Sequence, residues 1–100
     1  MTNEEIIYKA AILAGLYNEE EISYMVEKGI DIPIHTISGW KLRGNYKIKP
    51  GERGIETRLW KQKKQKGKGE ADGNNHNGFY LTKAYLFTKE QVELEEDKNV

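Results

Sequence analysis

The sequence predicts an α+β fold in which N-terminal helices pack on a small antiparallel sheet. Three patterns predict it. Apolar residues recur at helical spacing up to about residue 28, apolar and polar residues alternate from Tyr46 to about residue 60, and a second alternating, aromatic segment follows at 79–87. A chain of 100 residues builds one small core. We therefore expect a single domain over 1–95 and a frayed acidic tail at 96–100.

Two helices are expected in the first thirty residues. Thr2 and Glu5 have the spacing of a capping box, and an apolar stripe follows them, which predicts a helix over 3–15. Asn18 stands before a second stripe and predicts a helix over 19–28. Both first turns are acidic, which suits the positive end of a helix dipole.

Two shorter helices are also expected. Thr36 is suited to cap a helix that carries Trp40 and ends at Gly44. Near the end of the chain, Thr88 and Gln91 repeat the capping-box spacing, which predicts a short C-terminal helix through Val92 and Leu94.

The sheet is expected to consist of three strands. Alternation on both sides of a Pro-Gly-containing turn at 50–54 predicts a β-hairpin over 46–60, and 79–87 provides the third strand. The segment 61–78 between them is rich in Lys, Gly and Asn and almost free of apolar residues. We expect it to form a mobile loop.

The composition excludes several classes of protein. The chain has no Cys and two His, so disulfides and thiolate-bound zinc are excluded and a reducing cytoplasm is the simplest location. No apolar run is long enough for a membrane span. His35 and His76 have no partner at a recognised catalytic spacing. We therefore expect a protein that is not an enzyme and has no catalytic residues, no metal and no cofactor.

The net charge of zero conceals an uneven distribution along the chain. Residues 1–40 carry seven acidic and two basic side chains, residues 41–69 carry eleven basic and two acidic ones, and residues 70–100 are acidic again with seven against three. A basic block between acidic flanks predicts a localised site for an anionic partner.

Single-stranded nucleic acid is the partner that this block fits best, because it combines cations for phosphates with rings on which bases stack. The strand period places Arg58 and Trp60 on one face of the hairpin, and Lys83 and Tyr85 on one face of the third strand. The predicted nucleic-acid-binding residues are Lys47, Lys49, Arg53, Arg58, Trp60, Lys61, Lys63, Lys64, Lys83 and Tyr85.

Each of these features also has a purely structural interpretation. Aromatic residues at strand spacing usually pack in a core, which is our expectation for Trp40, Phe79 and Phe87, while Trp60 and Tyr85 fit either role. The lysines within 61–68 are equally typical of a solvated loop.

Several segments of the chain resemble the N-terminal domain of ArdC-type antirestriction proteins and their short phage and plasmid relatives. They read HTISGWKLRG at 35–44, YKIKPGERGI at 46–55, LWK at 59–61, KAYLF at 83–87 and EQV at 90–92. The resemblance implies binding of single-stranded DNA, with little sequence preference, by a bacterial or mobile-element protein. Pro50 departs from the family pattern, which is usually basic there. The metalloprotease-like domain of the full-length proteins has no counterpart in this sequence.

Two other functions remain open from the sequence. The acidic helices within 3–28 are also suited to a protein partner, which would make the chain an interaction or inhibitor module. A winged-helix transcription regulator would use 19–43 for its recognition helix and the hairpin as its wing. The acidic stretch 19–31 argues against that function, since duplex phosphates would repel it.

Overall fold

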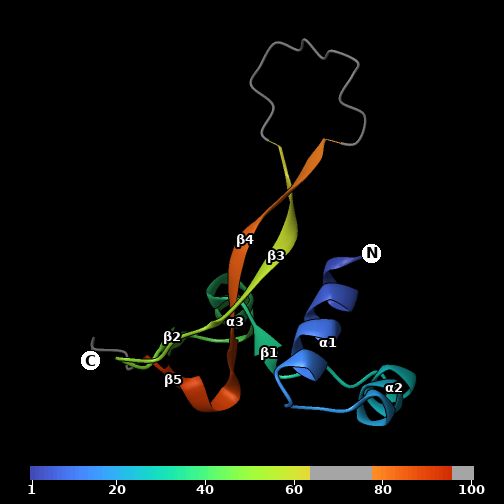
Figure 1. Cartoon of the computed structure of the whole chain (residues 1–100). Helices are drawn as coiled ribbons and strands as arrows, with labels where there is room; N and C mark the ends of the chain where they lie inside the picture. The colour runs from blue at the N-terminus through green and yellow to red at the C-terminus, as the bar shows by residue number, and fades with distance from the viewer. Residues whose placement is uncertain (64–77, 96–100) are drawn as a thin grey trace.

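The structure of the protein, a computed structural model, describes residues 1–63 and 78–95 and confirms the α+β fold. Figure 1 shows a twisted pair of long strands that extends away from the helices. The elements in chain order are α1 (Asn3–Leu13), α2 (Glu19–Lys28), β1 (Ile34–His35), α3 (Ile37–Arg43), β2 (Tyr46–Ile48), β3 (Ile55–Gln62), β4 (Phe79–Thr88), a 3-10 turn (Lys89–Gln91) and β5 (Val92–Leu94).

The three helices begin where their capping residues predict. The Thr2 hydroxyl accepts from the Glu5 backbone N–H while the Glu5 carboxylate accepts from the Thr2 N–H, and Asn18 forms the same capping box with Glu21. Thr36 accepts from the N–H of Gly39 at the start of α3. These bonds satisfy N–H groups that have no partner within a helix. No helix in residues 1–63 and 78–95 combines the length and apolar character that a membrane crossing requires.

The strands form two separate antiparallel units. β4 lies between β1 and β3, and the β3–β4 register runs from Ile55 opposite Leu86 to Gln62 opposite Phe79. β2 pairs instead with β5, with Lys47 opposite Glu93. We call β3 and β4 together the arm.

The predicted hairpin over 46–60 is wrong, because its two strands pair with different partners. The chain does turn after β2, where the Glu52 N–H bonds to the Lys49 carbonyl, but the Lys49 N–H bonds to the carbonyl of Gln91. The Gln91 side chain also donates to the carbonyl of Arg53 and to the Glu52 carboxylate. The contacts of Gln91 therefore fix residues 49–53 in a connection that does not bring β2 and β3 together.

Two further expectations need correction. The capping pair of Thr88 and Gln91 exists, with the Thr88 N–H bonded to Gln91 Oε1, but it starts only the 3-10 turn. Val92 to Leu94 form strand β5 instead. Apolar Val92 and Leu94 alternate with Glu93, and the segment pairs with β2, which provides partners for its backbone N–H and carbonyl groups. The loop expected at 61–78 begins later, because Lys61 and Gln62 still belong to β3. Its residues 64–77 and the tail 96–100 lie outside the described part.

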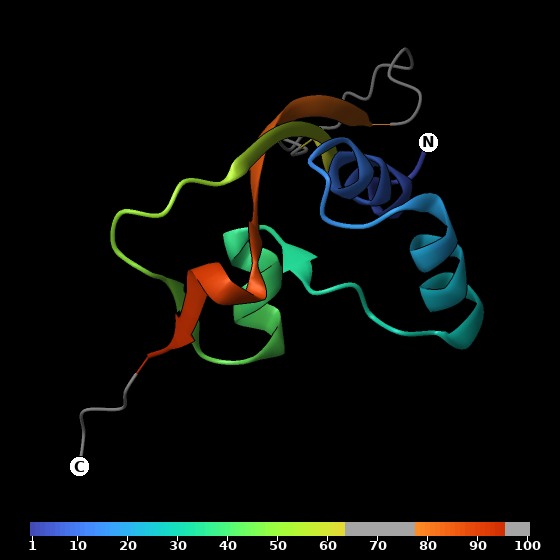
Figure 2. The same ribbon diagram turned by 60° about the horizontal axis from the view of Figure 1, so that its bottom comes forward.

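The main core lies where α1 and α2 meet the base of the arm. Its buried side chains are Ala11, Ile22, Met25, Ile32, Ile34 and Leu86, and Ile55 and Leu59 of β3 pack against them. Figure 2 shows α1 and α2 on one side of β4 and the β2–β5 pair on the other, while α3 overlaps the lower part of β4 in this view.

A smaller cluster joins α3 to the base of the arm. Trp40 is buried as expected, its Nε1–H donates to the Phe87 carbonyl at 2.9 Å, and its ring meets His35 and Tyr46 edge-on at centroid distances of 5.0 and 5.1 Å. Gly39 lies inside this helix because a Cβ there would be 2.9 Å from the His35 Cβ. The close approach of α3 to β1 therefore requires a residue without a side chain at position 39.

Candidate nucleic-acid interface

The outer face of the arm collects the strongest residues of the predicted site. Arg58 lies directly opposite Lys83, Trp60 opposite Leu81, and Glu56 opposite Tyr85. Residues that face each other across an antiparallel pair project to the same side of the sheet. We define the outer face by these six residues together with Phe79, which extends it toward the tip.

The outer face is exposed along its length. The exposed fractions of its apolar side chains are 40% for Trp60, 44% for Leu81, 45% for Tyr85 and 51% for Phe79. The expected core position of Phe79 is therefore wrong, because none of the helices in the described ranges 1–63 and 78–95 covers this end of the arm, whereas Phe87 at the base is half-buried. Rings and cations that water reaches on one surface are what stacking and phosphate contact require.

Arg58 and Lys83 place two like charges directly across the strand pair. Like charges in this position repel each other and destabilise a sheet. Glu56 offsets part of this charge, since its Oε2 lies 3.8 Å from Lys83 Nζ. No carboxylate in residues 1–63 and 78–95 forms an ion pair with Arg58. A phosphate bound between the two cations would relieve the repulsion.

Trp60 is held by the N-terminal segment. Its indole Nε1–H donates to the Met1 carbonyl at 3.0 Å. Its backbone N–H donates to Asn3 Oδ1 at 2.8 Å, and Asn3 Nδ2 donates back to its carbonyl at 3.1 Å. The ring is thus fixed at the edge of the arm while 40% of its surface remains exposed.

The structure does not bring all the predicted residues together. Lys61 and Lys63 lie toward the tip of the arm and are exposed. Lys47 lies on β2, 3.8 Å from the Glu93 carboxylate, and Lys49 and Arg53 belong to the connection between β2 and β3. Lys64 lies outside the described residues. The predicted site therefore divides into a group on the arm and a group beside the β2–β5 pair, which Figure 1 shows at a different part of the molecule.

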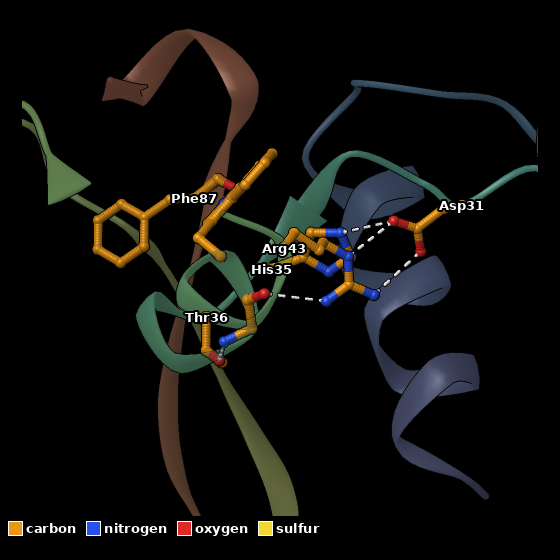
Figure 3. A network of polar contacts seen from close by, with 7 residues as sticks. Asp31, His35, Thr36, Arg43 and Phe87 are labelled. Atoms are coloured by element: carbon orange, nitrogen blue, oxygen red, sulfur yellow. Dashed lines mark hydrogen bonds and ion pairs between the residues drawn. The ribbon is translucent and has the colours of Figure 1, made fainter. Parts of the chain in front are cut away.

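Figure 3 shows a polar network around His35 whose members are not among the functional residues expected from the sequence. Arg43 donates to both Asp31 oxygens, at 2.8 and 3.2 Å, and to the Gly39 carbonyl at 2.9 Å. His35 Nε2 lies 3.2 Å from Asp31 Oδ2. The four-residue spacing of Asp31 and His35, with an Arg at the end of the next helix, was the available sequence signal.

Burial of His35 lowers its pKa below the ordinary value, and the Arg43 guanidinium acts in the same direction against the opposing effect of Asp31. The hydrogen bond from Arg43 lowers the pKa of the Asp31 carboxyl. At pH 7 and above, a pKa below the ordinary value leaves His35 mainly uncharged, and the position of its Nε2 beside the Asp31 carboxylate, which only accepts, assigns the proton to Nε2. The Thr36 hydroxyl accepts from the Gly39 N–H, and the network as a whole holds β1 and α3 to the preceding loop.

No three His, Asp or Glu side chains in residues 1–63 and 78–95 lie close enough together to hold a metal ion. Comparisons with family models, with curated proteins and with solved structures gave no match. The surface chemistry of the described residues is therefore the basis for any statement of function.

Proposed function

We propose that this chain is a non-catalytic domain that binds single-stranded DNA with low sequence specificity through the outer face of the arm. The observation that carries the proposal is the pairing of Arg58 with Lys83 between the exposed rings of Trp60 and Tyr85. This arrangement offers phosphate contacts and stacking surfaces within one strand pair. The resemblance to the ArdC-type N-terminal domain points to the same ligand.

The exposed rings of the arm, rather than its shape, support a single strand over a duplex. Recognition of duplex DNA usually places a helix or a two-stranded ribbon in the major groove, with side chains that read base edges. The outer face carries Arg58, Lys83 and Glu56 beside the exposed flat rings of Trp60 and Tyr85, and such rings favour unpaired bases, whose faces a stacked duplex does not offer. Bases that are free to leave the stack would lie on Tyr85 and Trp60 while Arg58 and Lys83 contact the backbone.

The proposal is tested by fluorescence anisotropy with a labelled oligo-dT strand at low salt. We expect the double variant Arg58→Ala/Lys83→Ala to bind at least about tenfold more weakly than the wild type. The double variant Lys28→Ala/Lys41→Ala removes the same net charge from exposed positions on α2 and α3 and serves as the control. Equal losses in the two double variants, or no binding by the wild type, would contradict the proposal.

Stacking is tested separately with Tyr85→Ala, which removes an exposed ring and no charge. A stacked base is worth about 1–3 kcal/mol, so we expect a loss of roughly five- to 150-fold in affinity. Tyr24→Ala removes a ring of similar exposure from α2 and is expected to leave affinity unchanged. Circular dichroism melting of each variant shows whether a loss of binding reflects a loss of the fold.

A further inference from the structure

β3 presents an unpaired edge. The strand order is β1-β4-β3, so one side of β3 pairs with β4, and within residues 1–63 and 78–95 no strand lies on its other side. The N–H and carbonyl of Trp60 point to this open side, where Asn3 bonds to both. Alternate residues of an antiparallel strand direct these groups to the same side, so those of Glu56 and Arg58 point there too. In the described part of the chain, none of the hydrogen bonds reaches them.

An apolar groove runs along the same edge. It has a volume of about 340 Å³ and lies between α1 and residues 55–57 of β3, with Met1, Ile6, Ala10 and Leu13 on the helix side. Leu13 is 82% exposed and Met1 65% exposed. Open strand edges are templates for pairing with another chain, and this one carries a patch that association would cover.

We propose that a second copy of this chain pairs with this edge, β3 against β3, in an antiparallel two-fold arrangement centred on Thr57. Glu56 then lies opposite Arg58 of the partner subunit, and Arg58 opposite the partner's Glu56. The outward N–H and carbonyl groups of both residues are satisfied by the same groups of the partner. The proposal concerns the protein alone and does not depend on its binding nucleic acid.

The charges on the edge favour this register over its two neighbours. A shift that centres the pair on Glu56 would place two glutamates opposite each other, and a shift that centres it on Arg58 would place two arginines opposite each other. Both arrangements are unfavourable, because like charges directly across an antiparallel pair destabilise it. A one-residue slip would turn core-facing residues outward. Asn3 already occupies the backbone of Trp60, so the pairing ends there.

This symmetry makes the interface isologous, since the same patch serves both subunits. The axis is perpendicular to the sheet, so the grooves beside α1 of the two subunits meet on one side and their apolar side chains cover each other. On the opposite side, the outer faces of the two arms become continuous. The result is a six-stranded sheet with the order β1-β4-β3-β3-β4-β1.

A single cysteine tests the register directly, because the chain contains none. Thr57 lies opposite the partner's Thr57 in a pair without hydrogen bonds, where the Cα atoms are about 4.5 Å apart, within the range of a disulfide. We expect Thr57→Cys to form a covalent dimer on mild oxidation, seen by non-reducing electrophoresis. Ser23→Cys, at an exposed position on α2, is the control. The proposal would be overturned if Thr57→Cys did not cross-link, or if Ser23→Cys cross-linked to the same extent.

A charge exchange tests the same pairing without cysteine chemistry. By sedimentation equilibrium, we expect the wild type to reach twice the mass of the chain, and both Glu56→Arg and Arg58→Glu to remain monomers. The double variant Glu56→Arg/Arg58→Glu exchanges the two charges and is expected to restore the dimer. A wild type that stays monomeric up to about 1 mM, or a double variant no better than the single ones, would overturn the pairing.

Discussion

At the scale of single residues, His35 has a structural role that its sequence context does not indicate. Its imidazole is packed between the Asp31 carboxylate and the Trp40 ring, and it is neutral because burial opposes its charge. The sequence shows no catalytic partner at a recognised spacing from His35, and the structure places the Asp31 carboxylate 3.2 Å from its Nε2. Its contact with Asp31 was hidden because it depends on how the chain bends at Pro33 between them.

The lowered pKa of His35 predicts that acidification destabilises the protein. The unfolded chain takes up a proton near the ordinary His pKa of 6.5, while the folded chain does so only at lower pH. The contribution of His35 to the free energy of unfolding is therefore fully present above pH 6.5. It falls as the pH drops below this value, by at most about 1.4 kcal/mol per pH unit. Asp31 has a lowered pKa and contributes a separate loss that begins below about pH 4.

Melting temperatures at about pH 7.5 and 5.5 check the His35 effect. We expect the wild type to lose more stability between these values than His35→Gln, which retains a donor for Asp31 but does not titrate. His76→Gln keeps His35 and is the matched control for the loss of one histidine. If His35→Gln shows the same pH dependence as the wild type, protonation of His35 does not cause the loss of stability.

At the scale of elements, α1, α2 and α3 could be predicted from the sequence, whereas the fate of the C-terminal capping pair and the strand partners could not. Capping residues act within a few positions of the chain, so Thr2, Asn18 and Thr36 locate the helix starts from sequence alone. Alternation likewise located β2, β3 and β4. Pairing is decided by contacts between distant segments, and the interactions of Gln91 with the turn after β2 were not visible in either segment alone.

Asn3 is the clearest contact between elements that sequence patterns do not reveal. Its amide bonds to the N–H and carbonyl of Trp60, so α1 is fastened to the edge of β3 by one side chain. We expect Asn3→Ala to lower the free energy of unfolding by about 1–2 kcal/mol, since two partly exposed hydrogen bonds are lost. Urea denaturation measures this value.

Ser23→Ala, an exposed polar residue on α2, is the matched control and is expected to change the free energy of unfolding by less than about 0.5 kcal/mol. An equally small effect of Asn3→Ala would mean that packing in the core alone holds α1 to the arm.

At the scale of the whole molecule, the sequence correctly indicated an outer face with Arg58, Trp60, Lys83 and Tyr85. The period of a strand fixes which side chains share a face, whatever the strand pairs with. The sequence did not indicate that Lys47, Lys49 and Arg53 lie apart from them, because their position followed from the hairpin that does not form.

The salt dependence of binding measures how many cations act together. Each phosphate contact to a single strand contributes about −0.7 to the slope of log affinity against log salt, so five contacts predict a slope near −3.5. We expect Arg58→Ala/Lys83→Ala to reduce its magnitude by about 1.4, and Lys28→Ala/Lys41→Ala to leave it unchanged. Anisotropy titrations at several salt concentrations provide the slopes. Equal slopes for all three proteins would show that the arm does not contact the backbone of the strand.

The contrast between the two tryptophans gives the protein its own optical probes. Trp40 is 4% exposed beneath α3, while Trp60 is 40% exposed on the arm. A soluble quencher will therefore reduce the emission of Trp60 first, and a strand lying on the arm will shield it without changing the signal of Trp40. One fluorescence titration of the unlabelled protein can thus distinguish occupation of the arm from loss of the fold.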